Sequence, residues 1–275
     1  MVSERLVEPP AVWADRQRGR TGLGLLASRV STFCLVELQK LRHDRTEMFT
    51  RAVQPVLWLV IFGQTFNRLH AIPTGGIPYL DFLAPGVIAQ SGMFVAIFYG
   101  IQIVWERDAG VLTKLLVTPT PRSALIIGKA FAAGIRSIIQ VVVVLILSVV
   151  LGVTLTENPL RILGAFVVVV MGSAFFACLS MTIAGVVLKR DRLIGIGQMI
   201  TMPLFFASSA LYPVAIMPSW LQALSRVNPL SYEVDALRGL LIDAPSHLWL
   251  DIGVLAFSVV VGIMASSLLV GRLAR

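Results

Sequence analysis

The stretch ERDAGVLTKLLVTPTPRSALIIGK, Glu106 to Lys129, lies between two long apolar runs of a 275-residue chain. It opens with three charged residues, Glu106, Arg107 and Asp108. Such residues suit a helix N-terminus, where an acidic side chain accepts hydrogen bonds from free backbone N–H groups. The stretch therefore predicts a short helix directly after an apolar run.

The same stretch carries a narrow apolar ridge, because three leucines follow at spacing i, i+3 and i+4: Leu112, Leu115 and Leu116. Lys114 points away from this ridge, and Pro119 disfavours helix at the residue before it. We predict a helix over residues 106–118. An exposed amphipathic helix of this kind fits a groove on another protein, and it equally fits a position along the lipid headgroups.

The composition places the chain in a membrane. Hydrophobic residues make up 56%, charged residues 14%, and the mean hydropathy is +0.83. A membrane-crossing helix needs roughly 20 apolar residues. We predict six spans in an all-α polytopic membrane protein, at about residues 50–67, 83–104, 124–151, 162–188, 194–211 and 252–270.

The distribution of positive charge predicts the orientation. Of the 23 Lys and Arg residues, 19 fall in segments that lie on one side when the N-terminus is cytoplasmic. The positive-inside bias therefore places both termini in the cytoplasm of a cell-membrane protein. The net charge of +8 is explained by this distribution, and we predict no nucleic-acid partner.

The N-terminal region reads in two parts. Residues 1–22 are polar and lack periodicity, which is typical of a flexible tail. Residues 23–48 show an imperfect amphipathic pattern, which indicates a helix in the membrane interface or an ordinary solvated helix. Cys34 and Cys178 lie too far apart in the sequence to suggest a disulfide framework or a metal site.

The segment 213–245 contains four prolines between apolar pieces that are too short to cross a membrane. Such pieces can dip in from outside and return, provided that protein or water covers their backbone polar groups. They can also rest on the outer headgroups, with Trp220, Tyr232 and Trp249 as interfacial anchors. Composition alone supports both arrangements equally.

Catalytic and ion-coupling chemistry is missing from the sequence pattern. None of the six apolar runs carries Asp or Glu in its interior, which argues against a transporter coupled to protons or sodium. The pair Gly128-Lys129 resembles a P-loop, but Ala130 stands where Ser or Thr holds magnesium. We predict no catalytic residues, no metal and no cofactor in this chain, so any driving energy comes from a partner.

Several polar and aromatic residues inside the predicted spans are candidates for a transport pathway. Arg136 can line the inner end of a pathway or can extend towards the cytoplasmic headgroups with a structural partner. Aromatic and amide side chains can line an apolar passage or can serve only in helix packing. The candidates of this second kind are Gln90, Phe94, Phe98 and Gln140.

The order of these features resembles the permease subunit of ABC-2 type exporters, and most closely the daunorubicin-resistance-type permeases. The resemblance covers about residues 30–270. The matching pieces are ELQKLRHDRTEMFTRAVQPVLWLVIFG, FLAPGVIAQ, ERDAGVLTKLLVTPTPRSALIIGK and SSALYPVAIMPSWLQALSRVNPLSYEVDALRG.

The resemblance implies an ABC-2 type transmembrane domain over residues 23–275. Residues 106–118 would be the coupling helix that docks on a separate ATPase subunit, and Arg190 would belong to a second cytoplasmic contact. Residues 23–48 would form an interfacial connecting helix, and residues 213–245 a re-entrant outer helical hairpin before the last span. The outer segment would include Trp220, Asn228, Pro229, Tyr232, Glu233, Asp235 and Arg238.

The partners that the resemblance implies are a second permease copy, identical or different, two copies of an ABC-type ATP-binding subunit, and membrane lipid. ATP and Mg would bind to the ATPase. The expected function is export of a hydrophobic or amphiphilic substrate, a drug or a lipid, across the cell membrane. The alternatives are export of a polysaccharide or lipid-linked glycan, and a membrane scaffold or assembly protein without transport activity.

Overall fold

The computed structural model describes residues 53–69, 72–110, 122–187 and 190–273. These residues contain helices and no strand, as the sequence predicted. The predicted tail 1–22 and interfacial helix 23–48 lie outside the described residues. The elements are η1 (Trp58–Gly63, a π-helix), α4 (Gln64–Leu69), α5 (Tyr79–Asp108), α7 (Arg122–Val150), α8 (Pro159–Val187), α9 (Arg190–Phe206), η2 (Val214–Ile216, a 3-10 helix), α10 (Ser219–Val227), α11 (Pro229–Leu241) and α12 (Leu248–Leu273).

Four helices of the described chain are long and apolar enough to cross a membrane: α5, α7, α8 and α12. They correspond to four of the predicted spans, with ends that differ by a few residues. The apolar part of α9 is shorter and runs from Arg192 to Phe206. The prediction that the fifth run continues as helix to residue 211 is wrong, because the chain leaves the helix after Phe206.

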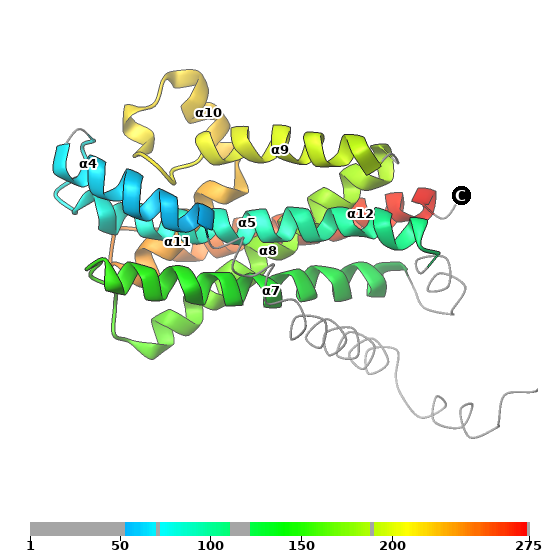
Figure 1. Cartoon of the computed structure of the whole chain (residues 1–275), viewed down its shortest axis with the longest axis horizontal. Helices are drawn as coiled ribbons and strands as arrows, with labels where there is room; N and C mark the ends of the chain where they lie inside the picture. The colour runs from blue at the N-terminus through cyan, green and yellow to red at the C-terminus, as the bar shows by residue number, and fades with distance from the viewer. Residues whose placement is uncertain (1–52, 70–71, 111–121, 188–189, 274–275) are drawn as a thin grey trace, which may run out of the picture.

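The long helices run alongside one another and alternate in direction (Figure 1). One end of the bundle holds the C-terminal ends of α5, α8 and α12 together with the N-terminal ends of α7 and α9. The other end holds the start of α8 and the segment with η2 and α10. The predicted inside and outside connections therefore fall at opposite ends of the bundle.

Helix α5 is the most deeply buried of the four crossing helices and packs against α7, α8, α9, α11 and η1. Small residues allow the close approach of α5 and α8. A Cβ atom at Gly100 would lie 2.7 Å from the Ala177 carbonyl oxygen, and the Ser180 hydroxyl donates to the Ile97 carbonyl at 2.7 Å. Small residues and interhelical hydrogen bonds are the usual means of packing helices in a membrane.

Two Asn-Pro-Leu sequences start helices in the same way. Asn158 precedes α8 and accepts a hydrogen bond from the Leu160 backbone N–H at 3.0 Å. Asn228 precedes α11 and accepts from the Leu230 N–H at 3.1 Å. Asn is a favoured N-cap, and proline fits the first helical position because its missing N–H has no partner there anyway. The Asn228 amide also donates to the Leu204 carbonyl at 2.7 Å, which ties α11 to α9.

The buried guanidinium of Arg238 fastens α11 to two other parts of the chain. It donates to the Ser209 carbonyl oxygen at 2.6 Å and to the carbonyl oxygens of Phe82 and Ala210 at 3.3 Å. Its central carbon lies 3.6 Å from the centre of the Phe82 ring. The Asp235 carboxylate forms an ion pair with the Arg238 guanidinium, with 3.4 Å between oxygen and nitrogen. The same carboxylate accepts a hydrogen bond from the Ser209 hydroxyl at 2.9 Å.

Replacing Arg238 with Ala should abolish most of the folded protein. The change removes the Arg238 donor from the buried carbonyl groups of Ser209 and Ala210, which lie outside any helix. Breaking a buried charged contact costs about 3–5 kcal/mol. The yield of monodisperse protein and its Tm in detergent measure the effect. Arg226→Ala is the matched control, since Arg226 is exposed on the neighbouring α10. Equal stability of the two variants would contradict this role of Arg238.

Candidate functional site

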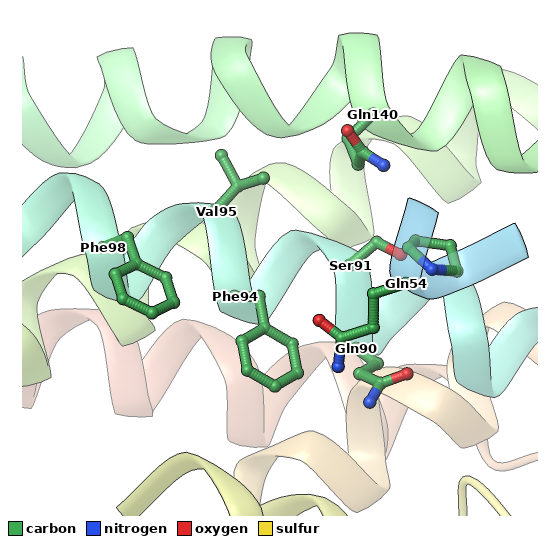
Figure 2. A pocket seen from close by; sticks show the side chains of 8 residues that line it. Gln54, Gln90, Ser91, Phe94, Val95, Phe98 and Gln140 are labelled. Atoms are coloured by element: carbon green, nitrogen blue, oxygen red, sulfur yellow. The ribbon is translucent and has the colours of Figure 1, made fainter. Parts of the chain in front are cut away.

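A cavity of about 250 Å³ lies between the helical residues before η1, helix α5 and helix α7. Figure 2 shows Phe94 and Phe98 projecting from the same side of α5, while Gln140 comes from α7. The lining residues are Gln54, Pro55, Gln90, Ser91, Phe94, Val95, Phe98 and Gln140. None of these eight side chains is charged.

Glutamine side chains supply most of the polarity of the cavity. Gln90 is buried, with 2% of its surface exposed, and its amide nitrogen has no hydrogen-bond partner among the described residues. Gln140 is buried on the facing helix, and Gln54 is half-buried. An amide both donates and accepts hydrogen bonds. The cavity therefore suits a neutral polar group better than a charged one.

Phe94 and Phe98 supply the apolar surface of the cavity. Their rings are stacked, with centroids 6.5 Å apart and planes inclined by 14°. Both side chains are half-buried. Rings arranged in this way offer a broad apolar face to another flat group.

The structure brings four of the five predicted pathway candidates together: Gln90, Phe94, Phe98 and Gln140. Three of them follow one another at i, i+4 and i+8 along α5, which places them on one helix face. Sequence reasoning missed Gln54 and Ser91. Gln54 reaches the cavity through the packing of separate helices, and no local pattern reveals that contact.

Arg136 lies apart from this cavity. Its guanidinium carbon is 4.7 Å from the centre of the Tyr99 ring, and the Lys129 ammonium is 5.3 Å from the same ring. Lys129 also lies 2.7 Å from the carboxylate of Glu106. This arrangement ties the C-terminal end of α5 to the N-terminal part of α7.

The predicted start of the coupling helix is wrong. Glu106, Arg107 and Asp108 form the last turn of α5, and Gly110 follows with φ +71°. Contacts within the protein hold these charges, because Glu106 pairs with Lys129 and Arg107 pairs with Asp108 at 2.8 Å. The other predicted contact residues, Leu112, Lys114, Leu115, Leu116 and the side chain of Arg190, lie outside the described part.

The predicted outer residues lie in α10, in α11 and at their junction. Trp220 is 68% exposed on α10, and the Tyr232 hydroxyl donates to the Arg226 carbonyl at 2.6 Å. Asn228 and Pro229 form the start of α11. Glu233, by contrast, is fully buried. The helix bundle therefore contains a buried carboxyl group that the hydropathy pattern of the six apolar runs did not reveal.

A double-mutant cycle measures the contact between α5 and α7. Lys129→Met and Glu106→Gln each leave a partly buried charge without its partner, whereas the double variant removes both charges. We expect the double variant to lose less stability than the sum of the single losses, by about 0.5–3 kcal/mol. The Arg107–Asp108 pair is the control, because exposed pairs contribute about 0–1 kcal/mol. Additive losses at Glu106 and Lys129 would contradict the contact.

The described chain has four apolar helices that are long enough to cross a membrane, and two of them, α5 and α7, line a cavity without charged side chains. These features indicate a multi-pass membrane protein. The sequence matches the family described as ABC-2 type transporter over residues 30–242. This match covers most of the chain, so the protein belongs to that family. It is an ABC transporter permease, a kind of subunit that acts with an ATP-binding subunit and is normally not an enzyme itself.

Three proteins of similar sequence illustrate the range of relatives. The ycf38 protein of Porphyra purpurea, whose name describes a transport permease, is 32% identical over 73% of this chain and 69% of its own. The daunorubicin resistance ABC transporter permease protein DrrB1 of Streptomyces coeruleorubidus is 24% identical over 82% and 77%. Nodulation protein J of Rhizobium leguminosarum bv. viciae is 28% identical over 79% and 84%.

Proposed function

We propose that this permease exports an uncharged or amphiphilic aromatic compound, such as a drug or a lipid-like molecule, out of the cell. The uncharged cavity with two stacked phenylalanines and three glutamines is the observation that carries the proposal. Flat apolar groups stack on phenylalanine rings, and neutral polar groups bond to amides. The name of one relative concerns daunorubicin resistance, which supports a drug-like substrate.

In the proposed topology the chain crosses the membrane six times and both termini are cytoplasmic. The first apolar run and α9 then act as short spans beside the four long ones. Helices α10 and α11 form a re-entrant hairpin on the outer side. Two copies of the permease, identical or different, bind two copies of the ATPase, which holds ATP and Mg.

In the proposed mechanism the cytoplasmic connection between α5 and α7 transmits the force. Five of the eight residues around the cavity come from α5, and Gln140 comes from α7. The Glu106–Lys129 pair joins the ends of these two helices next to that connection. Movement of an ATPase docked there therefore shifts both walls of the cavity together. The ATPase changes the state of the permease only by binding its two states unequally.

Replacing Leu112, Leu115 and Leu116 with Asp should release the ATPase. The charges remove the apolar ridge that we propose docks in the groove of the partner. Co-purification of the ATPase with the permease measures the loss. Leu224→Asp is the control, because Leu224 is exposed on α10 at the opposite end of the bundle. Unchanged association of the triple variant would contradict the docking assignment.

Phe94→Ala should weaken transport without unfolding the protein. We expect at least a tenfold higher substrate concentration for half-maximal stimulation of ATP turnover, because the stacking surface is lost. The measurement uses the reconstituted complex with aromatic drugs, lipids and lipid-linked sugars. Phe257→Ala is the control, since Phe257 is 70% exposed on α12. Equal effects of the two variants, or stimulation only by sugars, would contradict the proposed substrate class.

A further inference from the structure

Glu233 of α11 is a buried carboxyl group for which neither the fold nor the proposed transport cavity provides a role. None of its surface is exposed. Neither of its carboxyl oxygens has a hydrogen-bond partner among the described residues. It is separate from the cavity of Gln90 and Phe94, whose lining does not include it.

Two glycines make the space that the Glu233 carboxyl occupies. A Cβ atom at Gly172 of α8 would overlap both carboxyl oxygens. A Cβ atom at Gly92 of α5 would lie 3.9 Å from Oε1 of Glu233 and 3.2 Å from the Ser173 hydroxyl oxygen. We call the space bounded by Gly92, Gly172 and Ser173 the glycine notch. The carboxyl group of Glu233 from α11 fills this space.

Several charged side chains on α11 and on the helices that pack against it have partners other than Glu233. Asp81 of α5 accepts from Thr154, Arg161 of α8 pairs with Asp243, and on α11 itself Asp235 and Arg238 pair with each other. Those remaining on the helices that pack against α11 are Glu106, Arg107 and Asp108 in the last turn of α5, Asp251 near the start of α12 and Arg272 near its end. No ion pair joins any described side chain to Glu233.

The surroundings of Glu233 favour the protonated form of its carboxyl group over the ionised form. An ionised carboxylate without a cation or donors is far more costly to bury than the neutral acid. The neutral acid carries one O–H donor, which the ionised form lacks. The packed position of α11 against α5 and α8 therefore favours the protonated side chain.

We propose that Glu233 is a proton-binding site and that the packing of α11 in the glycine notch is linked to its occupancy. When α11 is packed, the O–H bond of the carboxyl is intact. When α11 moves away and water reaches the notch, the O–H bond breaks and the proton passes to water. The reverse movement takes up a proton. The linkage concerns the position of α11 and holds whatever molecule the permease exports.

The most direct test is infrared difference spectroscopy of the full-length permease in lipid nanodiscs. At neutral pH, wild type minus Glu233→Gln should show the carbonyl band of a protonated carboxylic acid, shifted in D₂O. Glu157→Gln should leave this band in place, because Glu157 is exposed in a loop. Absence of the band from wild type, or its persistence in Glu233→Gln, would overturn the proposal.

A second measurement follows the folded protein. Raising the pH above about 4.3, the ordinary pKa of a glutamate side chain, should lower the Tm of the wild type more than that of Glu233→Gln. The reason is that Glu233 then ionises in the unfolded chain, whereas the packed form has to keep the proton. The Glu157→Gln variant should follow the wild type. Superimposable profiles of wild type and Glu233→Gln would contradict the linkage.

The notch itself is tested by exchanging volume. Gly172→Ala should lower the Tm, and the added change Glu233→Ala should restore at least half of the loss, because it removes the group with which the methyl overlaps. This comparison also decides the outcome if Glu233→Gln does not fold. A loss that Glu233→Ala leaves unchanged or increases would show that the carboxyl does not occupy the notch.

Discussion

The contacts of the buried Arg238 guanidinium are the interaction on which the α10–α11 end of this permease depends. Helix α11 is too short to cross a membrane, and its flanking backbone groups need partners inside the protein. Arg238 donates to carbonyl oxygens at the start of α5 and in the segment after α9. A single side chain thus provides a donor for the carbonyl groups of Ser209 and Ala210 in the non-helical segment after α9. The position of Glu233 in the glycine notch follows from the same docking of α11.

The long helices could be predicted from the sequence because length and hydropathy act locally. The same reasoning extended the fifth helix too far. Residues 207–211 are apolar or small, but the carbonyls of Ser209 and Ala210 bond to Arg238, and that of Leu211 accepts from the Tyr79 hydroxyl at 3.1 Å. These contacts join residues far apart in the chain, and no hydropathy window contains them.

In the candidate site, too, local spacing could be predicted from the sequence, whereas contacts between distant segments could not. The spacing of Gln90, Phe94 and Phe98 placed them on one face of a helix, whereas the contribution of Gln54 depends on how helices pack. The charges of Glu106, Arg107 and Asp108 led us to predict the start of a helix, whereas these residues end α5. At the end of α5, Glu106 pairs with Lys129, which lies 23 residues further along the chain, and no local pattern contains that contact. The absence of acidic residues from the apolar runs was real, yet Glu233 is buried because a segment outside those runs folds into the bundle.

In the proposed topology the α10–α11 hairpin lies on the outer side of the membrane, and the end of α5 lies in the cytoplasm. The most direct measurement is labelling by a membrane-impermeant maleimide in intact cells, with single cysteines introduced after Cys34 and Cys178 are replaced. Trp220→Cys should react in intact cells, and Asp108→Cys only after permeabilisation. Reaction of Asp108→Cys in intact cells, or protection of Trp220→Cys until permeabilisation, would contradict the proposed topology.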